Sequence, residues 1–293
     1  MTLEKDRTLL VSFSGGETSA FMAAWLMKNK SKEYDLKFVF ANTGQENEQT
    51  LEFVRRCDSY FSLGVVWLET EPYYNERKSS GFRIVTFETA SRDGEPFDRI
   101  IKKYGIPNPA TPHCTRELKL SPIKAWAAKN LRADYETAIG IRVDEIDRMS
   151  KDALKNRLVY PLISWRPTTK EEINAFWRDM PFRLELKGYQ GNCVTCWKKS
   201  DRKLYAIAKE KPAAFACFDR LEKIYGSFVP ESRIKLMASR GESPPARTTF
   251  FRKHRSAQDI LRESAFFTGI VEDDAQIYDG ESCDIHAECG VDN

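Results

Sequence analysis

An α/β fold, in which a parallel sheet lies between layers of helices, is the architecture that this sequence predicts. Two observations support it. Short apolar runs at 8–13, 36–40 and 137–141 alternate with segments whose apolar residues recur at helical spacing. The first run leads at once into a glycine turn and then a helix, which is the order found where such sheets bind ligands. We therefore expect ligand-binding residues at the carboxyl ends of the strands.

Length and composition set the domain organisation. The chain has 293 residues, of which 41% are hydrophobic, and a formal net charge of +3. This length suits one large core with an appended unit, and we predict an α/β domain over 1–165 and a helical, cysteine-bearing region over 166–293. No apolar run reaches about 18 residues, and the chain enters its first strand without a signal-peptide core. We expect a cytoplasmic protein that has no membrane partner.

The turn after the first apolar run carries the strongest functional signal. Adjacent glycines let the main chain approach an anion closely, and hydroxyls and amide groups at a helix start donate hydrogen bonds to it. A simple glycine turn is the alternative. The turn has neither the Gly-Lys-Ser/Thr ending of the Walker loop nor the Gly-x-Gly-x-x-Gly pattern. Its candidate phosphate-binding residues are Ser14, Gly15, Gly16, Thr18 and Ser19.

Three later segments place polar residues where strands end or helices begin. The turn after the second apolar run contains Asn42, Thr43 and Gly44, Lys119 leads into a helix, and Arg142 follows the run at 137–141. An arginine at the carboxyl end of a strand faces the crevice in which doubly wound sheets bind ligands. Each cation taken singly could be a solvated surface residue. Taken together, these segments predict convergence on an anionic ligand.

The cysteines form a candidate metal site. Cys193 and Cys196 are two residues apart, a spacing that lets two thiolates face one tetrahedral centre. We expect a 4Fe-4S cluster. The alternatives are structural zinc, for which His286 is a possible ligand, and thiols that are unliganded or redox-active. Cys57 and Cys217 lie near phenylalanines and are interpreted as buried thiols. The further candidate ligands, from distant parts of the chain, are Cys114, Cys283 and Cys289.

Segments 14–19, 42–46, 113–119 and 140–145, in this order, resemble the phosphoadenosine phosphosulfate reductase family and its phage-type relatives, within the adenine nucleotide alpha-hydrolase (PP-loop) superfamily. Tyr160-Pro161-Leu162 and Trp165 extend the resemblance, which covers roughly residues 8 to 200. It implies that 1–165 form a PP-loop domain that binds an adenine nucleotide through the glycine loop and the Asn42 turn. Thr18 and Asn42 replace acids that are common in the family. The resemblance therefore leaves open whether magnesium binds with the nucleotide.

The resemblance also implies catalytic roles. Arg142 and Lys119 would neutralise phosphate or sulfate. Glu288-Cys289-Gly290 resembles the Glu-Cys-Gly-Leu-His tail in which a cysteine attacks the sulfate sulfur, so Cys289 is a candidate nucleophile. The tail lacks the final histidine, and its acidic surroundings would raise the pKa of a thiol. Ligation of the metal centre by Cys289 is therefore the alternative.

Three functions are compatible with these residues. A sulfonucleotide reductase would take sulfur from phosphoadenosine phosphosulfate and receive electrons from a thiol or redox protein. An ATP pyrophosphatase of the PP-loop type would cleave ATP between its α and β phosphates and transfer sulfur to an acceptor such as a nucleic acid. A binding module would hold nucleotide and metal centre without turnover.

A basic segment near the carboxyl end motivates the nucleic-acid hypothesis. Between Pro230 and Glu263 there are eight Lys or Arg against four acids, and Phe250 and Phe251 lie among them. Exposed rings among cations would stack on bases. If the rings belong to the core instead, the segment is a solvated basic loop.

Overall fold

The computed structural model describes residues 7–74 and 76–271 and has one sheet of six strands in the order β4-β3-β2-β1-β5-β6. All neighbouring pairs are parallel except β3 and β4, which are antiparallel. The predicted α/β class, with a largely parallel sheet, is therefore confirmed. The strands are β1 (Arg7–Ser12), β2 (Tyr34–Ala41), β3 (Val66–Glu71), β4 (Gly81–Val85), β5 (Glu136–Ala138) and β6 (Leu158–Val159).

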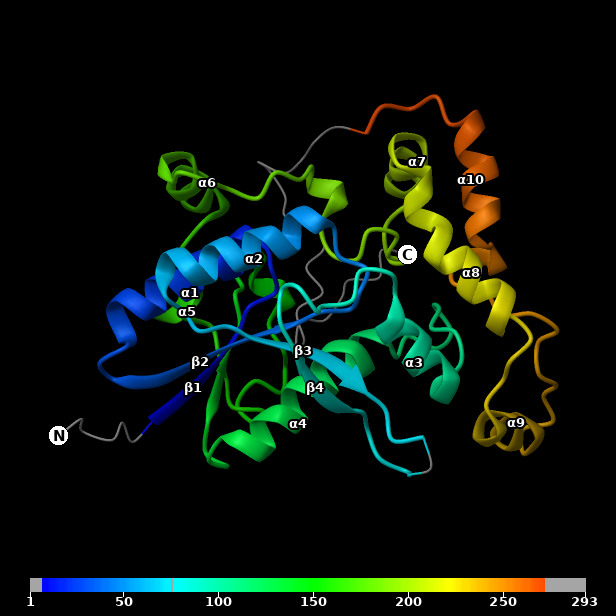
Figure 1. Cartoon of the computed structure of the whole chain (residues 1–293), viewed down its shortest axis with the longest axis horizontal. Coiled ribbons are helices and arrows are strands. Elements are labelled where there is room, and N and C mark those ends of the chain that lie inside the picture. The colour runs from blue at the N-terminus through cyan, green and yellow to red at the C-terminus, as the bar shows by residue number, and fades with distance from the viewer. Residues whose placement is uncertain (1–6, 75, 272–293) are drawn as a thin grey trace.

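Helices cover both faces of the sheet and extend beyond its edge, as Figure 1 shows. Within the described ranges, no helix has the length and apolar character needed to cross a membrane. The α-helices are α1 (Glu17–Lys30), α2 (Glu48–Phe61), α3 (Glu95–Tyr104), α4 (Ser121–Asn130), α5 (Pro161–Ser164), α6 (Lys170–Asp179), α7 (Asp201–Glu210), α8 (Ala216–Tyr225), α9 (Glu231–Ala238) and α10 (Ala257–Phe266).

The central strand β1 is buried on both faces. Leu9 and Val11 pack into the core beneath α1, α2 and α6, whereas Leu10 packs into the core beneath α4. Successive side chains of a strand point to opposite faces, so an uninterrupted apolar run supplies both layers. Trp177 of α6 belongs to the first of these cores. Packing on the sheet therefore extends past residue 165, where we placed the domain boundary.

A second body of helices packs beside the sheet. α3 joins α7, α8 and α10 around a separate apolar core, visible beyond the sheet in Figure 1. Phe250 and Phe251 are buried in it, and the ring of Phe250 stacks on that of Phe218 with centroids 4.0 Å apart. Of the two interpretations of the basic segment, the one with rings in the core is confirmed, and exposure of these rings for base stacking is excluded.

A buried carboxylate joins the segments of this second core. Glu222 of α8 accepts hydrogen bonds from the main-chain N–H groups of Phe250 and Ala257, each at 2.9 Å. Burial raises the pKa of Glu222 to about 7. The carboxyl group thus anchors the basic segment to α8.

The order of the strands defines where a ligand can bind. From β1 the chain proceeds through β2 and β3 on one side and returns to β5 and β6 on the other. The carboxyl ends of β1 and β5 therefore flank the point at which the direction of winding reverses, the usual ligand crevice of such sheets. The glycine loop follows β1, and Arg142 follows β5.

Candidate functional site

The two glycines of the loop have different structural roles. Gly15 has φ of +84°, and a Cβ there would lie 2.8 Å from Cγ2 of Thr50, so the fold requires glycine. Gly16 is the N-cap of α1, and a Cβ there would meet only Oγ of Ser14, at 3.8 Å. Gly15 therefore lets the loop pack on α2, and Gly16 leaves space at the head of α1.

The predicted hydroxyl groups gather within this loop. Ser14 Oγ donates to Ser19 Oγ at 3.0 Å, and Ser19 Oγ donates to the carbonyl oxygen of Gly16 at 2.9 Å. A Cβ on Gly140 would lie 3.3 Å from Cα of Ser19, so a glycine there lets the end of β5 approach the head of α1. The glycine loop and the segment after β5 therefore pack closely against each other.

Arg142 reaches the first turn of α1. Its side chain is 2% exposed, and Nη1 donates to Oγ1 of Thr18 at 3.0 Å. The guanidinium also pairs with Asp144, Nε to Oδ1 at 3.0 Å, and with Glu145, Nη1 to Oε2 at 3.1 Å. These contacts hold a cation against Thr18 in the first turn of α1.

A second arginine at the head of α1 escaped the sequence analysis. Arg183 donates from Nε and Nη2 to the two carboxylate oxygens of Glu17, both at 3.1 Å. The carboxylate also accepts the N–H of Leu184 at 3.3 Å, and Trp177 Nε1 donates to the Glu17 carbonyl oxygen at 3.0 Å. Arg183 follows Glu17 by 166 residues and belongs to no recognisable motif, so no sequence signal could have linked them.

The Asn42 side chain is committed to the protein interior. Nδ2 donates to Oε1 of Glu69 and to the carbonyl oxygen of Ser91, each at 2.8 Å, and Oδ1 accepts the N–H of Gly44 at 3.1 Å. Asn42 was predicted to bind the nucleotide, but its contacts shape the turn. An amide can donate to a carboxylate, whereas an aspartate here would oppose Glu69.

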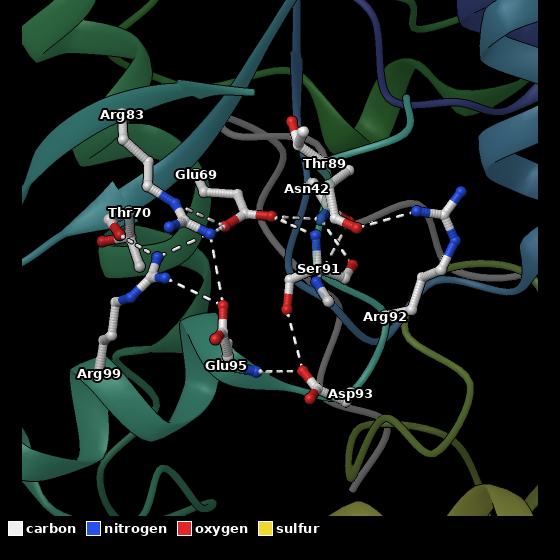
Figure 2. Close-up of polar contacts among 12 residues, drawn as sticks. Asn42, Glu69, Thr70, Arg83, Thr89, Ser91, Arg92, Asp93, Glu95 and Arg99 are labelled. Atoms are coloured by element: carbon white, nitrogen blue, oxygen red, sulfur yellow. Dashed lines mark hydrogen bonds and ion pairs between the residues drawn. The ribbon is translucent and has the colours of Figure 1, made fainter. Parts of the chain in front are cut away.

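Glu69, on β3, is the centre of a polar network that the sequence analysis missed. Its carboxylate is fully buried and accepts from Arg83 Nη2 at 2.6 Å and from the N–H of Ser91 at 2.6 Å, and Arg99 Nη1 lies 3.4 Å from it (Figure 2). Arginine pairing compensates the cost of burying its charge. Through the bond from Asn42 to Glu69, this network holds the turn that contains Asn42 in place.

Three predicted metal ligands line one small pocket. Cys114, Cys193 and Cys196 lie around a space of about 20 Å³ together with Thr43 and Lys119. The remaining walls are mostly apolar, a setting that excludes water and suits soft thiolate ligands. They are formed by Phe97, Thr115, Leu118, Trp197 and Phe218.

Main-chain and side-chain contacts bring the cysteine pair to the turn after β2. Val194 N–H donates to the carbonyl oxygen of Gln45 at 2.7 Å, and Oγ1 of Thr43 lies 3.3 Å from Sγ of Cys193. Thr43 Oγ1 also donates to Glu46 at 2.7 Å. The turn predicted to bind nucleotide is therefore part of the cysteine pocket.

A π-helical turn at Arg116–Leu120 joins the other two pocket residues. The N–H of Ser121 bonds to the carbonyl oxygen of Arg116, which widens the first turn before α4. Cys114 and Lys119 consequently line the same space although they are five residues apart. His113 lies beside this turn, and burial lowers its pKa to about 4, so its imidazole is neutral at physiological pH.

The described residues do not form a complete metal site. Across 7–74 and 76–271 no group of three or more His, Cys, Asp or Glu side chains has an arrangement that could hold a metal ion. The three thiols line one pocket but do not form such a group, so an iron-sulfur or zinc centre there would need further ligands. Cys283 and Cys289, including the predicted nucleophilic role of Cys289, lie outside the described residues.

Comparison with known proteins gives relatives that are named only as uncharacterized proteins. No family model matches the chain. It is 28% identical over 293 residues to the uncharacterized nin region protein ORF290 of Escherichia phage lambda, covering 93% of this chain and 96% of that protein. Two uncharacterized proteins of Methanocaldococcus jannaschii are 28% and 25% identical, covering 59% and 57% of this chain. The chain spans 29% and 36% of the length of these two archaeal proteins.

Proposed function

We propose that this protein is a phosphoadenosine phosphosulfate reductase-like enzyme that binds an adenine nucleotide at the glycine loop and acts in sulfur transfer or reduction. One observation carries the proposal. The glycine loop, Arg142 and a pocket with three cysteines lie at the carboxyl ends of neighbouring parallel strands. An anion site and a sulfur-rich site at one sheet edge suit a substrate that carries phosphate and reacts at sulfur.

The glycine loop supplies the anion contacts in this proposal. The space beside Gly16 admits an oxyanion to the amide groups at the head of α1, where the helix dipole favours negative charge. Arg142, which is paired with Asp144 and Glu145, donates a hydrogen bond to Thr18 in the first turn of the same helix. Lys119, at the cysteine pocket, is placed to stabilise charge that develops on the departing group.

The cysteine pocket is the proposed site of a 4Fe-4S cluster, with zinc as the alternative. Cys114, Cys193 and Cys196 would provide thiolate ligands, and a bound cluster would supply electron transfer or electrostatic stabilisation. Phe97 and Trp197 would keep water away from the ligands. Thr43, which contacts Cys193, links this site to the turn after β2.

A second candidate is an ATP-cleaving sulfurtransferase of the PP-loop type that modifies a nucleic acid. The acids beside Arg142 favour it. Asp144 and Glu145 place two carboxylates next to the residue that holds Thr18. Mg²⁺ binds through carboxylate and phosphate oxygens, so these acids suit a magnesium nucleotide better than a phosphosulfate.

Product analysis separates the candidates. The anaerobically purified chain is offered phosphoadenosine phosphosulfate with a dithiol reductant, and separately MgATP. Sulfite release supports the reductase, and release of AMP and pyrophosphate supports the ATP-cleaving enzyme. Tight nucleotide binding without either product would indicate a binding module and overturn both proposals.

A further inference from the structure

We propose that Arg183 is a positioning residue that keeps the carboxylate of Glu17 out of the phosphate cradle. This name denotes the glycine loop at 14–19 with the amide groups at the head of α1. This inference rests on the proposed function, because it assumes that an anion binds at the head of α1. Glu17 directly follows Gly16 and is the first residue of α1. A negative side chain at that position is a potential competitor for the groups that would hold phosphate.

The contacts around Glu17 hold its carboxylate on the side of α6. Arg183 engages both oxygens at 3.1 Å, and the Leu184 N–H adds a third hydrogen bond at 3.3 Å. The Glu17 side chain is 7% exposed. Trp177 fixes the backbone of the same residue through its carbonyl oxygen. The charge of Glu17 is thus neutralised and its direction is fixed.

Removal of Arg183 would change the electrostatics of the cradle. A carboxylate in the first turn of a helix is attracted by the amide groups and the positive end of the dipole. Without Arg183, the Glu17 carboxylate can turn to those amides or stay beside them with its charge no longer neutralised. In both cases it repels or displaces a bound oxyanion. Arg183 therefore acts on the ligand through Glu17 and requires no contact with it.

The neighbouring helix provides a matched control. Glu48 is the first residue of α2 and pairs with Arg92, Nε to Oε2 at 2.7 Å and Nη2 to Oε1 at 2.9 Å. This pair has the same chemistry and the same position in its helix. It belongs to a different loop, so its loss should leave anion binding at the head of α1 unchanged.

The test measures binding of inorganic pyrophosphate and of ATP by calorimetry, with folding checked by thermal unfolding. Arg183→Ala should weaken pyrophosphate binding by about tenfold or more. Glu17→Gln combined with Arg183→Ala should restore the affinity to within about threefold of the wild type, because the competing charge is gone. Arg92→Ala should bind like the wild type.

Each result has a defined meaning. Unchanged pyrophosphate affinity in Arg183→Ala, or a double variant as weak as the single one, would overturn the role of Arg183. A wild type that binds pyrophosphate but neither ATP nor phosphoadenosine phosphosulfate would overturn the proposed function alone. A wild type that binds none of these anions would overturn both.

Discussion

The glycine loop and the cysteine pocket lie at the same edge of the sheet but are built in opposite ways. The loop is a continuous stretch of chain whose glycine at 16 leaves space beside the main chain. The pocket is assembled from side chains of five separate segments: Thr43, Phe97, residues 114–119, residues 193–197 and Phe218. The loop rests on the sheet core, whereas the pocket rests on the helical core around Phe218.

The heads of α1 and α2 show how this difference arises. Both helices begin with a glutamate paired to a distant arginine. α1 is preceded by Gly16, which has no side chain. α2 is preceded by Asn47, whose Nδ2 donates to the carbonyl oxygen of Gln190 at 2.8 Å, just before the cysteine pair. A single residue thus separates a helix start that can accept an anion from one that is tied to another segment.

The largest expected effect comes from a side chain placed in the loop. Gly16→Val should reduce nucleotide affinity on the order of 100-fold, because it fills the space beside the helix head while the fold tolerates it. Gly15→Val should instead lower the free energy of unfolding by about 1–3 kcal/mol, since its φ is positive and Thr50 is in the way. Normal nucleotide binding by Gly16→Val would remove the loop from the proposal.

The next test addresses the pocket. Protein purified without oxygen should be brown, with broad absorption near about 400 nm if the thiols hold an iron-sulfur cluster. The double variant Cys193→Ser/Cys196→Ser should lose its metal, measured by elemental analysis. Cys217→Ser is the control, because Cys217 contacts the Asp93 carbonyl oxygen and lies outside the pocket lining. Stoichiometric zinc in a colourless protein would replace the cluster assignment, and metal retained by the double variant would move the ligands elsewhere.

A pH experiment tests the buried carboxyl group of Glu222 in the helical core. The pKa of Glu222 is raised to about 7, above its value of about 4.3 in an unfolded chain. Its protonated form therefore stabilises the fold fully below about pH 4.3, and this contribution is lost as pH rises through about 7. Relative to Glu222→Gln, the wild type should lose about 3 kcal/mol of unfolding free energy across this range. A difference that is constant with pH would contradict the raised pKa.

The smallest effect concerns the turn between the two sites. Asn42→Asp should lower the free energy of unfolding by about 1–3 kcal/mol, because a donor to Glu69 becomes a second buried carboxylate. Adding Glu69→Gln should recover part of that loss, as chemical denaturation would measure. If Asn42→Asp is as stable as the wild type, the network of Glu69 does not determine the choice of asparagine.

Local sequence was enough to predict the glycine loop and the strands β1, β2 and β5, whereas β3, β4 and β6 were not predicted. A strand, a glycine turn and a helix are consecutive in the chain, so their geometry is decided within about 20 residues. The Cys-x-x-Cys spacing predicted a shared pocket for the same reason, and Arg142 was found from its place after a strand. The exposure of Phe250 and Phe251 was left open by the sequence, because their burial depends on Phe218 and Phe97 from other helices.

The sequence by itself determined the α/β class, the position of the glycine loop and the identity of the cysteines. Tertiary structure alone decided that Arg183 pairs with Glu17, that Asn42 donates to Glu69, and that Thr43 joins the pocket of the cysteines. These contacts join residues 27 to 166 positions apart. Main-chain geometry follows from neighbouring residues, whereas ion pairs and thiol clusters depend on how packed cores bring distant segments together.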